Sequence, residues 1–154
     1  MIVGIDPGAS GALAFFDHVA GTLDIVDMPT VEVRRGNKLK RELSAQMLTA
    51  IIASRKPASA IVERVGAMPG QGVSSMFQFG RNVGTIEGVL AALHIPITMI
   101  APQIWRKLAQ VREGKDGSRQ RAGELFPAYA ATFARVKDDG RADAAIIAWT
   151  VVAQ

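Results

Sequence analysis

Ile2-Val3-Gly4-Ile5-Asp6-Pro7-Gly8 opens the chain and joins two strong local signals. Its apolar run at 2–5 favours a short buried strand, and Asp6-Pro7-Gly8 is a strong turn sequence. Asp6 therefore stands where the strand ends. One role for an aspartate in this position is simply to form the turn. It can also be a functional carboxylate, because ligands of open α/β sheets bind beyond the carboxyl ends of the strands.

The elements that follow are in an order typical of an α/β domain. Runs at 12–16 and 22–26 predict two more strands around a turn near Ala20-Gly21, which gives an antiparallel meander, and a basic loop follows at 31–42. Hydrophobic periodicity and turn signals then predict a helix at 43–54, a strand at 59–62, a helix at 75–93, a strand at 96–100, a helix at 102–109, a helix capped by Ser118 that ends near Phe126-Pro127, and a helix at 140–152. This order predicts one α/β domain over 1–154, with a five-stranded mixed sheet of meander and parallel strands flanked by helices.

The composition narrows the possible chemistry. The chain has 154 residues, no cysteine and only two histidines, His18 and His94. Disulfide frameworks, thiolate zinc sites and cysteine nucleophiles are thereby excluded, and a metal would be a hard ion such as Mg²⁺ or Mn²⁺ held by carboxylates. No apolar stretch approaches the roughly 18 residues that span a bilayer. We expect a cytoplasmic protein with no membrane partner.

Basic residues are concentrated in two segments. The net charge is +4, but 31–42 holds five basic and two acidic residues, and 102–141 holds nine basic and five acidic ones. The pattern indicates either a polyanionic partner such as DNA or a solvated surface. If the partner is DNA, the candidate contacts are Lys107, Lys115 and Arg119 in the second segment and Arg34, Arg35 and Lys38 in the first.

Acidic side chains follow two strands and begin the last helix. Glu63 comes directly after the strand at 59–62, and parallel pairing with the first strand would bring it beside Asp6. Asp139 and Asp143 are four residues apart, so a helix would place them on one face, although Asp139 could also be only an N-cap. Crowded carboxylates repel each other unless cations neutralise them. Two divalent ions would do so and would support phosphodiester hydrolysis.

Four segments resemble, in order, the motifs of the RuvC family of Holliday junction resolvases. The opening segment is similar to the first strand of that family. The other three are Ala60-Ile61-Val62-Glu63, which resembles the second catalytic strand, Phe79-Gly80-Arg81-Asn82-Val83-Gly84, which resembles the glycine-bearing helix, and Arg141-Ala142-Asp143-Ala144-Ala145, which resembles the C-terminal catalytic helix. The segment 102–127 is most similar to the compact phage-encoded branch, through Trp105, Lys107, Lys115, Ser118, Arg119 and Phe126-Pro127.

The resemblance implies a ribonuclease-H-like fold, a homodimer, two Mg²⁺ ions per site, which Mn²⁺ can replace, and symmetric nicking of branched DNA. It assigns catalysis and metal binding to Asp6, Glu63 and Asp143. The fourth ligand is open, because the family often spaces its last two carboxylates three apart and Gly140 occupies that position here. Asp139 can be this ligand if the helix begins at about Gly140 and leaves Asp139 outside helical geometry. Asp138 is the alternative.

Gly80, Gly84 and Gly88 recur every four residues along the helix at 75–93. Each costs about 1 kcal/mol relative to alanine, so three on one ridge predict the close approach of another backbone. That backbone belongs either to the same domain or to the second subunit of a homodimer, which would place two active sites on two symmetric strands. Met68, in the loop after Glu63, is either a core residue or an apolar wedge that unstacks bases, as this region does in the family.

These features predict a metal-dependent endonuclease that cleaves branched DNA. A catalytically silent junction-binding protein would keep the basic surface, but it would not need crowded carboxylates. A ribonuclease H that acts on RNA–DNA hybrids, or a flap nuclease, would share the fold and the metal chemistry. An ATPase of the actin and sugar-kinase superfamily also carries Asp-x-Gly after its first strand, but that fold needs two such domains and the chain is long enough for one.

Overall fold

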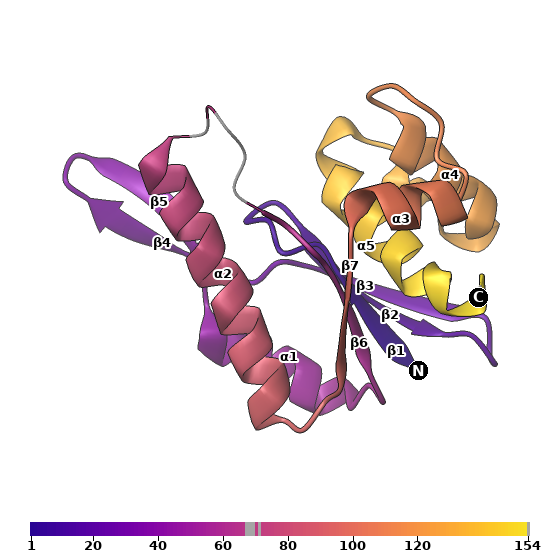
Figure 1. The fold of residues 1–154 in the computed structure, drawn as a ribbon, viewed down its shortest axis with the longest axis horizontal. Helices are drawn as coiled ribbons and strands as arrows, with labels where there is room; N and C mark the ends of the chain where they lie inside the picture. The colour runs from indigo at the N-terminus through magenta and orange to yellow at the C-terminus, as the bar shows by residue number, and fades with distance from the viewer. Residues whose placement is uncertain (67–69, 71, 154) are drawn as a thin grey trace.

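A five-stranded mixed sheet lies at the centre of the protein (Figure 1). A computed structural model describes residues 1–66, 70 and 72–153. The sheet has the order β3-β2-β1-β6-β7, with β1 at Ile2–Ile5, β2 at Ala12–Asp17, β3 at Thr22–Asp27, β6 at Ala60–Glu63 and β7 at Ile97–Ile100. The first three strands form an antiparallel meander, while β1 pairs in parallel with β6 and β6 with β7. The predicted α/β fold with a mixed sheet is confirmed.

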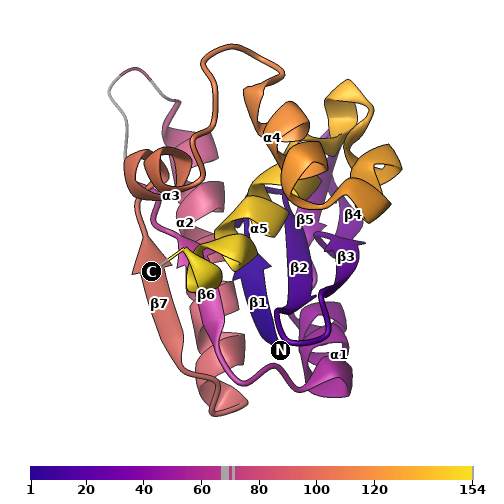
Figure 2. The ribbon, with the colours of Figure 1, turned by 90° about the vertical axis from the view of Figure 1, so that its right-hand side faces the viewer.

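Helices cover both faces of this sheet, so the core has two halves (Figures 1 and 2). Alternation along β1 assigns Val3 and Ile5 to the half under α1 and α2, and Ile2 to the half under α3, α4 and α5. The helices are α1 at Ala45–Arg55, α2 at Val73–Ala92, α3 at Pro102–Leu108, α4 at Gly117–Leu125 and α5 at Asp139–Trp149, with 3₁₀ turns at Pro127–Phe133, Val136–Asp138 and Thr150–Val152. Among the residues described, no helix is long and apolar enough to cross a membrane.

Gly4 allows α5 to pack directly on β1. A Cβ atom at this position would lie 2.4 Å from the carbonyl oxygen of Ala144 and 2.4 Å from the backbone nitrogen of Ala148. No larger residue fits at such distances without moving the helix. The close approach places the first turns of α5 beside the carboxyl end of β1, where Asp6 follows the strand.

The basic segment at 31–42 is a β-hairpin, so its prediction as a loop was wrong. β4 at Thr30–Arg35 and β5 at Lys38–Leu43 pair antiparallel as a separate two-stranded sheet. Arg35 pairs with Lys38, which leaves Gly36 and Asn37 as a two-residue turn with Gly36 at a φ of 61°. A Gly-Asn pair between two strands is a hairpin signal, and here the high charge of the strands concealed it.

The helix expected to be capped by Ser118 begins two residues earlier, so the prediction of Ser118 as its cap was wrong. Asp116 is the N-cap residue of α4, and Ser118 is buried within the first turn. A Cβ at Gly117 would lie 2.0 Å from the carbonyl oxygen of Arg112, so the preceding loop fixes the start of the helix. Ser118 is thereby turned inward, where its hydroxyl accepts a hydrogen bond from Nη1 of Arg106 at 3.2 Å.

Candidate metal centre

Asp6 lies just beyond β1, in a sharp turn. Its Oδ1 accepts a hydrogen bond from the backbone N–H of Gly8 at 3.0 Å, so the residue does form the turn. The turn is tight, because a Cβ at Gly11 would lie 2.2 Å from the carbonyl oxygen of Asp6. Burial raises the pKa of the Asp6 carboxyl, and the hydrogen bond from Gly8 partly opposes that effect. Asp6 therefore forms the turn and also provides a desolvated carboxylate, which a bound cation would stabilise.

Glu63 is the last residue of β6, the parallel neighbour of β1. Ile5 pairs with Val62, so the residues that follow each of them emerge at the same edge of the sheet. Burial raises the pKa of Glu63 to about 7, with smaller contributions in the same direction from the charges of Asp6 and Asp143. A hydrogen bond to Oε1 from Nε1 of Trp105, at 3.0 Å, favours the ionised form. Glu63 is therefore a half-buried acid that Trp105 holds by a hydrogen bond.

Asp143 lies on α5, above the ends of β1 and β6. Burial raises the pKa of its carboxyl to about 6, and the charge of Asp6 acts in the same direction. A hydrogen bond with the Ser118 hydroxyl and the charge of Arg106 lower that pKa. The Oδ1 atom of Asp143 is buried and has no hydrogen-bond partner. An unsatisfied buried carboxylate oxygen is costly, and it needs an explanation such as a bound ion or water.

Asp139 is the first residue of α5 and not its N-cap. The N-cap residue is Asp138, and Asp139 has helical dihedral angles, φ −54° and ψ −47°. The expectation that Asp139 lies outside helical geometry was therefore wrong, and so was the alternative that it is only a cap. Its side chain nevertheless lines a pocket of about 290 Å³ together with Asp6 and Asp143.

Gly140 explains why this chain has no carboxylate at the spacing usual for the family. A Cβ at Gly140 would lie 2.4 Å from the carbonyl oxygen of Ser10, 2.7 Å from Cα of Gly11 and 3.0 Å from Oδ2 of Asp6. The turn after β1 therefore fills the space that any side chain would need. An acidic group can reach this pocket from residue 139 but cannot be accommodated at 140.

The residues present fit a hard divalent cation by their chemistry. Within residues 1–66, 70 and 72–153, no three Asp, Glu, His or Cys side chains lie close enough together to form a ready-made metal site. The carboxylates of Asp6, Glu63 and Asp143 are nevertheless desolvated, the charge of Asp6 raises the pKa of the other two, and Asp143 has an oxygen with no partner. Carboxylate oxygens are the ligands that Mg²⁺ and Mn²⁺ prefer. A bound cation would offset both the repulsion and the unmet hydrogen bond.

Asp138, the alternative fourth ligand, has partners of its own. Its carboxylate accepts hydrogen bonds from Nε and Nη2 of Arg135 at 3.0 and 2.8 Å and from the backbone N–H of the same residue at 2.9 Å. The hydrogen bonds from Arg135 hold the pKa of Asp138 at about 2. The side chain lines a different pocket, which it shares with Asp27 and Arg141. Asp139, and not Asp138, therefore reaches the pocket of Asp6.

Arg119, a candidate DNA contact, is held inside the protein. Its side chain is 11% exposed, and its Nε donates to Oδ1 of Asp139 at 2.7 Å. The guanidinium also pairs with the carboxylate of Asp116 and donates to the carbonyl oxygen of Ala134. To bind phosphate, Arg119 would have to leave these partners. In this arrangement it instead fixes the position of the Asp139 carboxylate.

The other candidate DNA contacts are dispersed over the surface. Lys107 on α3 and Lys115 before α4 are exposed, as are Arg34 and Lys38 on the hairpin. The backbone of Arg35 belongs to β4, whereas Met68 lies outside the described residues. None of these four exposed residues lines the pocket of Asp6. They lie on two separate parts of the chain, which DNA would have to span.

Gly80, Gly84 and Gly88 face open space. No atom of the described chain lies within 4 Å of the position that a Cβ would take at any of them, leaving out the helix's own backbone. The alternative that another segment of the same domain packs on this ridge is therefore wrong for the described residues. A shallow pocket of about 250 Å³ runs beside Gly80 and Gly84, with Val65 and Glu87 in its lining. The ridge is free to meet another molecule.

Sequence reasoning missed three residues that support the carboxylates. Trp105 donates a hydrogen bond to Glu63, the Ser118 hydroxyl lowers the pKa of Asp143, and Arg106 donates to Ser118. Trp105 and Glu63 are 42 positions apart, so no local pattern connects them. The only hint in the sequence was a tryptophan within a basic segment. Its 1% exposure in the fold shows that the indole of Trp105 is buried, where it donates a hydrogen bond to Glu63.

The mixed sheet, its helical layers and the acidic edge define an α/β fold of the ribonuclease-H-like type. Two solved structures share it over nearly the whole chain. The Thermus thermophilus RuvC structure has a TM-score of 0.60 at 14% identity and covers 98% of this chain and 95% of that chain. The T. thermophilus RuvC in complex with Holliday junction substrate has a TM-score of 0.63 at 14% identity, with coverage of 99% and 92%. No family model and no curated protein matches the sequence. The protein therefore has the fold of RuvC.

Proposed function

We propose that the protein is a metal-dependent endonuclease of the RuvC family that cleaves branched DNA, such as a four-way junction. The observation that carries this proposal is the set of three desolvated carboxylates, which lie in the turn after β1, at the end of β6 and on α5, and one of them has an oxygen with no partner. The likeness to a RuvC that was solved in complex with a Holliday junction substrate supports DNA as the ligand. We treat residues 1–154 as one catalytic domain.

In this proposal Asp6, Glu63, Asp139 and Asp143 hold two Mg²⁺ ions, and Mn²⁺ can replace them. Bound ions supply an activated water and neutralise charge on the leaving oxygen during phosphodiester hydrolysis. The protein's own contribution is to keep its ligands in place. Trp105 holds Glu63 through a 3.0 Å hydrogen bond, and Arg119 holds Asp139 at 2.7 Å. Burial of Asp6, Glu63 and Asp143 strengthens their attraction for a cation, because water screens them less.

A homodimer follows from the open ridge of Gly80, Gly84 and Gly88. Three glycines in a helix cost stability unless a close contact offsets the loss, and the described chain supplies no such contact. A second copy that packs across this ridge would do so. A two-fold axis there would also present two acidic sites to two symmetric strands of a junction.

The decisive experiment compares synthetic four-way, three-way, flap and RNA–DNA hybrid substrates in Mg²⁺, Mn²⁺, Ca²⁺ and EDTA. We expect nicking of branched DNA in Mg²⁺ or Mn²⁺ and none in Ca²⁺ or EDTA, with binding retained in EDTA. Asp6→Asn, Glu63→Gln and Asp143→Asn should each abolish nicking while they keep or improve binding. Asp17→Asn is the matched control, because Asp17 ends β2 beside an exposed turn and asparagine can accept the same hydrogen bond from the backbone N–H of Val19.

Other outcomes would assign other functions. Binding of junctions without nicking in any metal, by the unmodified protein, would identify a silent junction-binding protein. Preferential cleavage of the hybrid or of the flap would identify a ribonuclease H or a flap nuclease of the same fold. Cleavage of four-way junctions at the parent rate by both Asp6→Asn and Asp143→Asn would refute the carboxylate mechanism.

A further inference from the structure

The β4–β5 hairpin has a composition that packing does not explain. It is separate from the main sheet, and four of the six residues of β5 are exposed. An isolated two-stranded hairpin is only marginally stable in water, and this one buries little apolar surface. Over 30–43 it carries five basic and two acidic residues. The segment therefore adds positive charge to the surface and little to the core.

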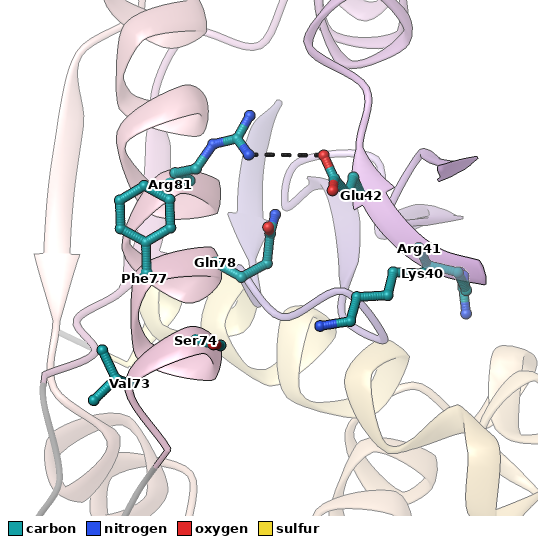
Figure 3. Close-up of a pocket in the computed structure, with 8 residues that line it drawn as sticks. All are labelled: Lys40, Arg41, Glu42, Val73, Ser74, Phe77, Gln78 and Arg81. Carbon is teal, nitrogen blue, oxygen red and sulfur yellow. Dashed lines mark ion pairs between the residues drawn. The ribbon is translucent and has the colours of Figure 1, made fainter. Parts of the chain in front are cut away.

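A groove of about 440 Å³ separates the hairpin from the first turns of α2 (Figure 3). Nη1 of Arg81 lies 3.7 Å from Oε2 of Glu42, an ion pair that bridges the two walls. The Lys40 side chain extends from β5 into the space between the walls, toward the side of α2 that carries Ser74 and Gln78 (Figure 3). We call this space the hairpin groove, lined by Lys40, Glu42, Ser74, Phe77, Gln78 and Arg81.

The strand pattern places two lysine side chains on the face of β5 that is turned to α2. Glu42 of β5 contacts Arg81 of α2, so the face of the hairpin that carries Glu42 is turned to that helix. Side chains two apart in a strand share a face, which places Lys40 and Lys38 on the same side. They repeat every ~6.8 Å along the strand, from a rise of ~3.4 Å per residue. Lys40 lines the groove, and Lys38 lies one repeat away on the same face, so the two ammonium groups suit two successive phosphates of one extended nucleic-acid strand.

The groove continues toward the metal centre. A second hollow of about 260 Å³ shares Lys40, Ser74 and Gln78 with the hairpin groove and is also lined by Ala9. Ala9 belongs to the turn that carries Asp6, and the neighbouring Gly8 and Ser10 line the carboxylate pocket. Adjoining hollows thus lead from the carboxylates, over the turn after β1, to the hairpin.

We propose that the hairpin groove binds the unpaired strand that flanks the phosphate to be cleaved. This inference rests on the proposed nuclease function and adds the path of the DNA to it. The positive side chains complement a polyanion. A volume near 440 Å³ is that of a small-molecule pocket, so it accepts one nucleotide unit and not a duplex. Phe77 is 69% exposed at the edge of the groove, where an unpaired base can stack on its ring. The hairpin therefore selects DNA that offers an open strand beside the cut.

The first test measures binding in EDTA by fluorescence anisotropy, with a labelled 12-nucleotide single strand and a blunt duplex of the same sequence. Lys40→Ala should flatten the slope of log K against log salt by about 0.7 for the single strand, the value for one lost phosphate contact. The slope for the duplex should not change. Lys56→Asn is the matched control, because it removes one charge at the C-cap of α1, where the positive φ suits asparagine. Equal slopes for Lys40→Ala and the parent protein would overturn the proposal.

The second test uses the absence of cysteine from the chain. Lys40→Cys and Lys56→Cys each introduce a single thiol, which can exchange with a mixed-disulfide tether on a nucleotide beside the branch point of a four-way junction and release the small thiol of that tether. We expect cross-linking at residue 40 and not at residue 56. Equal yields at the two positions would refute the groove. A loss of dimer in sedimentation of Lys40→Ala, with strand affinity unchanged, would instead assign the groove to a second copy of the chain.

Both tests are independent of catalysis. If the parent protein nicks no substrate in Mg²⁺ but residue 40 passes both tests, the nuclease proposal fails and the strand groove stands. If the parent protein nicks junctions and residue 40 fails both tests, the groove fails and the nuclease proposal stands.

Discussion

Replacing Glu63 by glutamine should stabilise the metal-free protein at alkaline pH. The pKa of Glu63 in the folded chain is raised to about 7 from an ordinary value of 4.5, chiefly by burial. The folded protein therefore holds a proton that the unfolded chain has lost between these two values. The stability linked to this proton is fully present below pH 4.5 and is lost as the pH rises through 7. Glutamine has no proton to lose.

The size of the effect follows from the same two values. Each pKa unit corresponds to about 1.4 kcal/mol, so the interval between 4.5 and 7 corresponds to about 3 kcal/mol. In EDTA, Glu63→Gln and the parent protein should have similar free energies of unfolding at pH 4. At pH 8 the variant should be more stable by up to about 3 kcal/mol. Urea unfolding followed by circular dichroism measures both values.

Two controls make this prediction specific. Glu113→Gln removes an exposed glutamate from the loop before α4 and should change stability by less than about 0.5 kcal/mol at either pH. Saturating Mg²⁺ at pH 8 should stabilise the parent protein and have little effect on Glu63→Gln, because a ligand stabilises only the state that binds it. If the variant and the parent protein have the same free energy of unfolding at pH 8 in EDTA, the fold does not raise the pKa of Glu63, and the prediction is wrong.

Three further predictions test the supports of the site. Trp105→Phe keeps a buried aromatic ring but removes the N–H that donates a hydrogen bond to Glu63. The pKa of Glu63 should then rise from about 7 to about 8, because a hydrogen bond to a charged group is worth about 1.5 kcal/mol. A ¹³C NMR titration of the Glu63 carboxyl measures this pKa, and an unchanged value would contradict the role of Trp105. Gly140→Ala forces a methyl group to within 2.4 Å of a backbone oxygen, and thermal unfolding should reveal a loss of about 1–3 kcal/mol or more; a variant as stable as its parent would mean that α5 can retreat from the turn after β1. Gly84→Leu adds a large side chain to the open side of α2, so the variant should fold but form less dimer in sedimentation. An unchanged dimer fraction would place the interface elsewhere.

Several features of the fold could be predicted from the sequence, because they depend on neighbours in the chain. Apolar runs ended by turns located the strands at Ile2–Ile5 and Ala60–Glu63, and their parallel pairing follows from the connection between them. The same reasoning placed Asp6 and Glu63 at one edge of the sheet. It failed at the hairpin of 30–43, where charged side chains hid the alternation of two strands that bury little.

The contacts that complete the site could not be predicted, because they join residues that are distant in sequence. A collision with Ser10 and Gly11 excludes a side chain at Gly140, and no local pattern reports that collision. Arg119 fits the sequence pattern of a phosphate contact, but in the fold its charge is paired with Asp139.

By itself the sequence determined the order of the elements and the kind of chemistry, because periodicity, turn residues and the absence of cysteine are properties of the chain. Only the tertiary structure decided which carboxylates share a pocket, which oxygen of Asp143 lacks a partner, and that the glycines of α2 face open space. Desolvation and close packing depend on every segment that surrounds a residue, and those segments meet only when the chain has folded.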